Sequence, residues 1–400
     1  MSAPSRLLSR WPVYAEDEVE AVSEILRSGR VNSLHHGEQC AALEQAFAEL
    51  CAMPHAIAVA NGTLALELAL RALQVGAGDE VIVPARSFFA TASCVVAAGA
   101  TPVFADVDLA SGNLDPAAVR SVISPNTRAV LCVHLAGWPC DMAALRGICD
   151  EHGLLLIEDC AQAHGATFEG RPVGGFGDAA AFSFCTDKII STGGEGGLLL
   201  LRDGEAFDRA WSYKDHGKDR ARTFAPAGGM SRFRWLHSSF GTNWRLTEMQ
   251  AAIGVAQMAK LPDWLQARRR NAGILADTLE SVPGVIVDRP AENLGHAYYK
   301  YYARIDTELY RAPGARDSIA SAIAAHGPFC GSGSCPEMYL EDAVRGSGFE
   351  PAVRLPNARA LGQSSIMFQC DQTLSADAMA EIGAIAAEVI GNWGREQAAA

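Results

Sequence analysis

Lys188 has the sequence surroundings of a lysine that could act as a nucleophile. It follows an apolar run at 180–184 and precedes the glycine-rich stretch at 193–197. A lysine held in a partly dehydrated cleft at the end of a strand can attack a carbonyl carbon and form a Schiff base. The alternative is an ordinary surface lysine on a loop, and the spacing taken alone favours that alternative.

Two further polar residues follow a second apolar run. Asp159 and Gln162 come directly after residues 154–158. Ligands of open α/β sheets bind at the carboxyl ends of the strands, so both side chains could reach the same cleft as Lys188. An aspartate in this position is more often a helix cap, which is the other interpretation of Asp159.

A third segment could bind a phosphate. In Asn61-Gly62-Thr63 a strand is expected to turn into a helix, and the free N–H groups of a helix N-terminus attract anions. Simple capping by Asn61 or Thr63 would explain the same residues. Taken together, however, the three segments supply what pyridoxal 5′-phosphate (PLP) needs: a lysine for the Schiff base, a carboxylate for the pyridine nitrogen and a phosphate cup.

The elements that must position these residues are read from apolar periodicity. Short apolar runs alternate with amphipathic helical stretches up to about residue 260, which predicts a doubly wound α/β domain with a mostly parallel sheet covered on both faces. Strands are expected at 56–60, 80–84, 102–105, 128–134, 154–158, 180–184 and 198–202, and helices at 16–28, 38–50, 63–75, 91–98, 115–123, 141–152 and 247–260.

Leu261-Pro262 is expected to break the chain and to open a second domain. The division is therefore residues 1–260 for a large domain and 261–400 for a smaller α+β domain. In the latter, strands are predicted at 284–288, 296–305 and 365–368, and helices at 315–326 and 375–393.

Composition excludes several classes of protein. The 400 residues carry a net charge of −13, which argues against general nucleic-acid binding. No apolar stretch reaches the ~20 residues of a membrane span, and the N-terminus lacks a signal-peptide core. The 11 cysteines form no C-x-x-C pair, and the ten histidines show no metal-ligand spacing. We expect a soluble cytoplasmic enzyme without a metal.

The sequence resembles the DegT/StrS-type family of PLP-dependent sugar aminotransferases, which have the type I fold of PLP enzymes. The resemblance extends over nearly the whole chain. Its anchors are Asn61-Gly-Thr-Leu-Ala-Leu, Gly78-Asp-Glu-Val-Ile-Val-Pro, Gly99-Ala-Thr-Pro-Val-Phe-Ala-Asp-Val-Asp, Glu158-Asp-Cys-Ala-Gln-Ala, the run from Ser183 to Lys188 with Gly196-Gly197, and Asn243-Trp-Arg-Leu-Thr-Glu-Met-Gln-Ala-Ala-Ile.

The resemblance implies a role for each matching residue. Lys188 would form the Schiff base with PLP, Asp159 would hold the pyridine nitrogen protonated, and Gln162 would lie near the ring hydroxyl. Phe88 would stack on the ring, with its neighbour Phe89 in the core. The phosphate would be bound by Gly62, Thr63, Ser183 and, from the neighbouring subunit of an obligatory homodimer, Asn243.

Other features bear on the substrate. Between Lys214 and Arg245 seven basic residues face two acidic ones, which suits an anionic substrate or a solvated loop at the dimer interface. His216, Lys218 and Arg245 are the candidate pocket residues in this stretch. The run 268–270 of three arginines is expected on an exposed helix face.

Two departures from the family pattern limit what the resemblance implies about the substrate. Glu195 lies one residue further from the lysine than the family's spacing, which leaves the shape of this loop open. The segment 329–339 also differs from the stretch that shapes the family's sugar pocket.

The resemblance implies an aminotransferase that uses an amino-acid donor, most often L-glutamate in such enzymes. The expected acceptor is a keto sugar, in particular a nucleotide-linked keto-deoxysugar. A cyclitol ketone or a free keto sugar acid is a second possible acceptor, and a PLP-binding regulatory protein without turnover is a third interpretation. Family members that dehydrate sugars have histidine in place of the lysine, so Lys188 argues against that activity.

Overall fold

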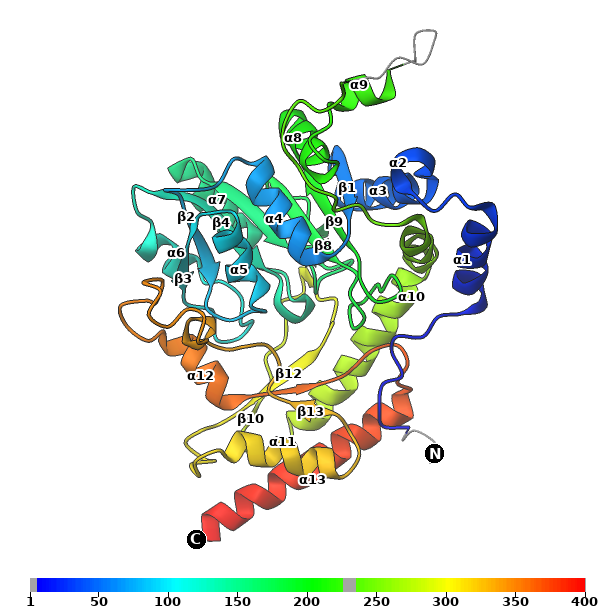
Figure 1. Cartoon of the computed structure of the whole chain (residues 1–400). Helices are drawn as coiled ribbons and strands as arrows, with labels where there is room; N and C mark the ends of the chain where they lie inside the picture. Colours follow the sequence, from blue (N-terminus) through cyan, green and yellow to red (C-terminus); the bar gives the residue numbers. More distant parts are fainter. Residues whose placement is uncertain (1–5, 226–234, 400) are drawn as a thin grey trace.

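The computed structural model describes residues 6–225 and 235–399, and a seven-stranded sheet forms its centre (Figure 1). The strand order is β1-β9-β8-β5-β4-β2-β3. The strands are β1 (His55–Val59), β2 (Glu80–Pro84), β3 (Thr101–Ala105), β4 (Thr127–Val133), β5 (Leu155–Asp159), β8 (Ala179–Ser183) and β9 (Gly197–Leu201). Every strand predicted before residue 260 is present within about two residues.

Strand directions place the carboxyl ends of β1, β4, β5 and β8 at one edge of the sheet. Pairing is parallel from β3 through β2, β4 and β5 to β8. β9 runs antiparallel to both β8 and β1, so β1 points in the same direction as β8. An apolar run does not reveal its direction in a sheet, which is why β9 reads like its parallel neighbours.

Both faces of the sheet are covered, as the apolar runs predict. Alternate residues of β9 enter different cores: Leu199 and Leu201 pack with α4, whereas Leu198 and Leu200 pack with α3. The first face is covered by α4 (Gly62–Ala72), α5 (Ala90–Ala97) and α8 (Gly204–Lys214), and the second by α3 (Glu38–Cys51), α6 (Pro116–Val122), α7 (Met142–His152) and part of α10.

Helix α10 (Glu248–Leu279) contradicts the predicted break at Leu261-Pro262, because it continues through Pro262. A proline inside a helix removes one backbone hydrogen bond. Burial on both sides of it outweighs that loss: Ala251 and Gly254 pack near α3, and Leu275 and Leu279 lie in the C-terminal core. Figure 1 shows α10 running from the sheet toward α13.

The C-terminal part has its own four-stranded sheet in the order β10-β12-β14-β13. Its strands are β10 (Val285–Ile286), β12 (Tyr301–Ile305), β13 (Cys330–Gly331) and β14 (Ser365–Phe368), and its helices are α11 (Ala315–Ala325), α12 (Pro356–Ser364) and α13 (Ala376–Ala399). β12 begins five residues later than predicted because 296–300 forms a turn with Tyr298 at φ 48°. Since α10 spans residue 260, the division there stays a prediction.

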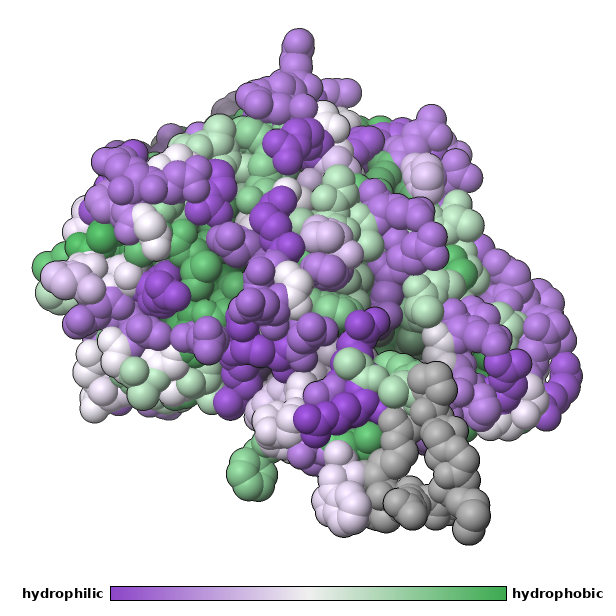
Figure 2. Space-filling view, turned by 90° about the horizontal axis from the view of Figure 1, so that it is seen from above, coloured by the Kyte–Doolittle hydropathy of each residue, from purple (hydrophilic) through white to green (hydrophobic). Residues whose placement is uncertain are grey.

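The remaining elements are short or peripheral. They are α1 (Glu16–Ser28), α2 (Ser33–His36), α9 (Arg220–Phe224), the 3-10 turns at Leu135–Gly137 and Met338–Leu340, and a small sheet of β11 (Leu294–Gly295), β6 (Thr167–Phe168) and β7 (Arg171–Pro172). Figure 2 shows the face above α8 and α9 as mostly hydrophilic with scattered hydrophobic areas. Within the described residues, no helix is both long and apolar enough to cross a membrane.

Candidate active site

The sheet brings Lys188 and Asp159 together. Asp159 ends β5 and pairs with Ala181 of the neighbouring parallel strand β8, and Lys188 lies in the loop that follows β8. A cavity of about 720 Å³ opens at this edge. Seven of the predicted site residues line it, namely Gly62, Thr63, Phe88, Asp159, Gln162, Ser183 and Lys188.

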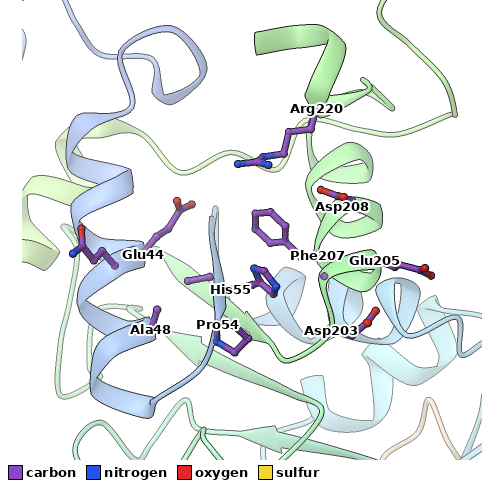
Figure 3. Close-up of a pocket in the computed structure, with 12 residues that line it drawn as sticks. Glu44, Ala48, Pro54, His55, Asp203, Glu205, Phe207, Asp208 and Arg220 are labelled. Carbon is purple, nitrogen blue, oxygen red and sulfur yellow. The ribbon is translucent and has the colours of Figure 1, made fainter. Parts of the chain in front are cut away.

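A larger hollow of about 820 Å³ lies elsewhere, between α3, β1 and α8 (Figure 3). There His55 stacks on Phe207, with ring centroids 4.8 Å apart. The guanidinium of Arg220 also lies over the Phe207 ring, 5.1 Å from its centroid. None of the predicted site residues lines this hollow. We therefore place the chemistry in the smaller cavity.

The backbone around Lys188 is held by two distant segments. The indole of Trp11 donates a hydrogen bond of 2.7 Å to the Lys188 carbonyl, and the amide of Ser191 donates one of 2.9 Å to Gln257 of α10. The lysine amine itself is 3.4 Å from the hydroxyl of Tyr299, and its side chain is 16% exposed. This amine is thus fixed in place but reachable from the cavity.

Asp159 is buried, and one of its oxygens accepts the amide hydrogen of Ala161 at 3.0 Å. Burial raises the pKa of this carboxyl, against smaller opposing effects of the Ala161 amide and of the charges on Lys188 and His134. A pyridinium cation beside this carboxyl would lower its pKa. The protein groups alone act in the opposite direction, because they leave the carboxylate poorly solvated.

The N-terminus of α4 lies at the cavity, where the sequence predicts a phosphate-binding cup. Asn61 caps the helix by accepting the amide of Leu64 at 2.9 Å, so the capping interpretation applies to Asn61, while Thr63 lines the cavity. A Cβ on Gly62 would lie 2.6 Å from that of Ser183, so only glycine allows this close approach. The first amides of α4, Thr63 and Ser183 therefore surround one point suited to a phosphate.

Phe88 and Gln162 flank the cavity from other loops. Phe88 is 67% exposed and its ring lines the cavity, whereas Phe89 packs against the core, the arrangement that the resemblance implies. The Gln162 side-chain oxygen accepts the Ala136 amide at 2.7 Å, which fixes its orientation. Their roles toward a cofactor ring stay predictions.

The glycine-rich turn accommodates its extra residue with left-handed backbone. Gly193 and Gly194 have φ of 79° and 125°, conformations that favour glycine. The Gly194 carbonyl accepts the Thr186 amide at 3.0 Å, and the Glu195 carbonyl accepts the Gln250 side-chain amide at 2.6 Å. The turn is closed by these bonds, and the Glu195 side chain reaches the cavity.

The predicted substrate and partner-facing residues lie outside this chain's own cavity. Lys218 and Arg245 both pair with Asp215, at 3.2 and 2.6 Å. His216, next in the chain after Asp215, has a backbone φ of 63°. The backbone of Asn243 forms an isolated antiparallel β-bridge with that of Asp215. None of the four lines the cavity described above. Arg232 and Arg234, also in the predicted basic stretch, lie outside the described residues.

Sequence reasoning missed the wall that the C-terminal part contributes. Tyr299, Lys300 and Tyr302 line the cavity, together with Ser334 from the divergent segment 329–339, and Asp187 beside the predicted lysine was missed as well. A possible signal was the lysine inside Tyr298-Tyr-Lys-Tyr-Tyr302, because a charged residue is unusual within a buried aromatic strand.

Arg268 corrects the prediction that the three arginines occupy an exposed helix face. Its side chain is 1% exposed and donates to the carbonyls of Tyr298 and Tyr299 at 3.1 and 3.3 Å, while Arg269 and Arg270 are exposed. The helix extends past Pro262, and this changes which side of the run faces the protein. Arg268 therefore holds the turn that carries Tyr299 and Lys300.

One buried group has the composition of a metal site. Within the described chain, His134, Glu158 and Cys160 have ligand atoms within 4.8 Å of one another. However, Glu158 already accepts the amides of Gly174, Phe176 and Gly177 at 2.7–2.8 Å, and the His134 Nδ1 accepts that of Cys140 at 3.0 Å. These bonds explain the group as a structural anchor for the 173–177 loop.

Comparison with known proteins now gives the family. The model of the DegT/DnrJ/EryC1/StrS aminotransferase family matches residues 12–386. The chain is 37% identical over 343 residues to a dTDP-3-amino-3,4,6-trideoxy-alpha-D-glucose transaminase of Streptomyces venezuelae, covering 86% of this chain and 84% of the relative. It is 39% identical over 305 residues to an L-glutamine:2-deoxy-scyllo-inosose aminotransferase of Streptoalloteichus tenebrarius, covering 75% and 71%.

A solved aminotransferase structure from Psychrobacter cryohalolentis superimposes with a TM-score of 0.92 at 45% identity, covering 96% of this chain and 99% of that one. The protein belongs to the DegT/DnrJ/EryC1/StrS aminotransferase family and is a PLP-dependent aminotransferase. The cavity fits this cofactor: it combines a lysine, a buried carboxylate, an exposed aromatic ring and a helix N-terminus closed tightly enough to exclude a side chain at Gly62.

Proposed function

We propose that this protein transfers the amino group of L-glutamate to the ketone of a nucleotide-linked keto-deoxysugar. The observation that carries the proposal is the meeting of Lys188, Asp159 and the α4 N-terminus in one cavity of a sugar aminotransferase chain. PLP, when bound, takes up the donor's amino group and passes it to the ketone.

The chain's own residues then have distinct roles. With PLP bound, Lys188 would act as the base that moves a proton from the donor's α-carbon, and its position at the cavity would hold its amine within reach. Asp159 would stabilise positive charge on the ring nitrogen. That positive charge would in turn compensate the negative charge of the buried Asp159 carboxylate. The first amides of α4 bind the phosphate.

The acceptor class is supported by relatives. The transaminase of S. venezuelae is named for a dTDP-linked amino sugar, which supports a nucleotide-linked ketone. The inosose aminotransferase at 39% identity supports a cyclitol ketone as the second candidate.

The 11 cysteines are free thiols, which supports our expectation of a reducing, cytoplasmic setting.

The test is to supply the PLP-loaded protein with L-glutamate and, separately, a set of nucleotide-linked keto sugars and 2-deoxy-scyllo-inosose. We expect one 2-oxoglutarate for each amino sugar formed, measured by mass spectrometry. Turnover with 2-deoxy-scyllo-inosose alone would favour the cyclitol candidate, and decolourisation by glutamate without product from any acceptor would contradict both.

We further propose that the site is completed by a second copy of the chain. Asn243 is exposed and does not line the cavity of its own chain, as expected of a residue that serves a neighbour. Phe240 and Phe224 are 99% and 59% exposed, and Val19 and Leu26 of α1 are 49% and 57% exposed, so apolar side chains are available to pack against a second copy.

A mixed dimer tests this sharing. We would co-refold inactive Lys188→Ala and Asn243→Ala chains. If Asn243 acts across the interface, each hybrid contains one site with both wild-type residues and has about half of the wild-type activity. Because random pairing makes about half of the dimers hybrids, an equimolar mixture should recover about a quarter of the wild-type activity. If Asn243 acts within its own chain, no hybrid site is intact, and mixing restores nothing.

A further inference from the structure

Lys300 is the second cation of the active-site cavity. Among the described residues that line this cavity, the basic ones are Lys188 and Lys300, and the acidic ones are Asp159, Asp187 and Glu195. Lys188 is committed to the cofactor. A negatively charged group of a substrate therefore has one protein cation left in this chain's lining.

The two lysines face the same partners. The Nζ atoms of Lys188 and Lys300 each lie 4.7 Å from the centroid of the Tyr299 ring. They lie 3.9 and 4.0 Å from the two carboxylate oxygens of Asp187. Lys300 therefore shares the Tyr299 ring and the Asp187 carboxylate with the lysine that an incoming amino group must replace.

The carboxylate of Asp187 is shared between the two lysines. Burial would raise the pKa of Asp187, but Lys188, the Tyr299 hydroxyl and Lys300 outweigh it, so the pKa is lowered and the group is a carboxylate. Tyr299 donates its hydroxyl hydrogen to Asp187 and is neutral. One carboxylate is thus shared by two amines, and Lys300, 4.0 Å from it, keeps hydrogen-bond donors for an anion in the cavity.

The position of Lys300 is fixed by its backbone. The Tyr299 amide donates to the Ala136 carbonyl at 2.8 Å, and Arg268 holds the Tyr298 and Tyr299 carbonyls from the other side. Tyr298 keeps a left-handed φ of 48°, which costs energy for a tyrosine and persists where the surroundings impose it. Lys300 is therefore presented to the cavity by a rigid turn.

We propose that Lys300 binds the α-carboxylate of the amino donor. This inference rests on the proposed function and names a residue that would bind its amino-acid donor. An α-amino acid carries its carboxylate on the carbon next to its nitrogen, so a donor nitrogen that replaces the amine of Lys188 brings the carboxylate toward the neighbouring cation. Lys218 and Arg245, which the sequence suggested for anions, pair with Asp215 instead.

The experiment compares Lys300→Met with Lys300→Arg in the PLP-loaded protein. Mixing with L-glutamate alone is followed by the loss of yellow colour over a range of glutamate concentrations. We expect kcat/KM for this half-reaction to fall about 10- to 100-fold in Lys300→Met, mainly through KM, since one charge-assisted hydrogen bond is lost. Lys300→Arg should recover most of it.

A second readout does not depend on turnover. Succinate, an unreactive dicarboxylate, should bind the wild type and Lys300→Arg with similar affinity in calorimetry and bind Lys300→Met about tenfold more weakly. Unchanged glutamate kinetics and unchanged succinate binding in a yellow, folded Lys300→Met protein would overturn the proposal. So would a loss confined to the keto-sugar half-reaction. If the wild type itself does not decolourise with glutamate, the proposed function fails, and this inference fails with it.

Discussion

The two walls of the active-site cavity differ in how the chain builds them. One wall consists of short loops that directly follow β1, β5 and β8, and it carries Gly62, Asp159 and Lys188. The other consists of the 296–300 turn and the 333–335 segment, which belong to the C-terminal part. The first wall is fixed by adjacent strands of one sheet, and the second by contacts between residues far apart in the chain.

This difference suggests a division of labour. The strand-end wall holds groups that any PLP-dependent transamination needs, whereas the C-terminal wall holds groups that can vary with the donor and the acceptor. Changes in the first wall should therefore abolish the reaction with all substrates. Changes in the second should reduce it for particular substrates and leave cofactor binding largely intact.

The largest effect is expected for Lys188→Ala. The variant loses both the amine that binds PLP and the base that moves the proton, so turnover should fall by more than about 10³-fold. The bound yellow colour should also disappear. Borohydride reduction of the wild type followed by peptide mapping should find the label on residue 188, and a label on Lys300 would interchange the roles that we assign to the two walls.

Asp159→Asn should follow, with a loss in kcat of about 10²-fold or more while PLP still binds. The amide keeps the size of the side chain and its bond to the Ala161 amide but removes the negative charge that stabilises the ring nitrogen. Stopped-flow spectra with glutamate would measure the slower step. A variant with wild-type kcat would show that this wall does not supply the charge.

Tyr299→Phe probes the C-terminal wall and should lower kcat about tenfold. The change removes the hydroxyl that donates to Asp187 and accepts from Lys188, so both groups lose a fixed partner. Because Tyr299 acts through Lys188, the pH profile of kcat should also move. The measurement is kcat against pH with saturating glutamate and keto sugar.

Tyr301→Phe is the matched control for that variant. The Tyr301 hydroxyl is buried without a hydrogen-bond partner and does not line the cavity, so its removal should leave both kcat and the pH profile unchanged. Equal losses in the two variants would mean that the effect is not specific to the Tyr299 hydroxyl and its contacts with Asp187 and Lys188.

The smallest effect concerns stability in the absence of PLP. Because burial raises the pKa of Asp159 in the folded chain, its ionised form destabilises the fold at neutral pH, and this penalty vanishes once the group is protonated in both states. PLP-free Asp159→Asn should therefore melt about 1–3 °C above the PLP-free wild type at pH 7. The difference should shrink as the pH falls toward about 4. A variant that melts lower at pH 7 would contradict the sign.

Much of the fold could be predicted because strand and helix periodicity is local. The strand-end residues were predictable for the same reason: Asp159 and Lys188 are each placed by the apolar run just before them. Tyr299 and Lys300 were not, because a turn at Tyr298 interrupts a run that reads as one continuous strand, and the contacts that stabilise this turn come from Ala136 and Arg268.

The errors have related causes. Pro262 has the local signature of a helix end, yet packing on both sides of it keeps α10 continuous. The direction of β9 depends on its neighbours β1 and β8 and cannot be read from the residues of β9 themselves. Arg268 was assigned to solvent because its partners, two backbone carbonyls 30 and 31 residues further along the chain, have no sequence signature.

The continuity of α10 has a mechanical consequence. Gln257 near its middle anchors the loop of the Schiff-base lysine, and Arg268, three turns further on, anchors the turn that carries Lys300. A hinge at residue 260 would have allowed the amines of Lys188 and Lys300 to move apart whenever the two parts of the chain moved. The continuous helix fixes the separation of these amines instead, and this separation must suit the distance between the nitrogen and the carboxylate of a donor.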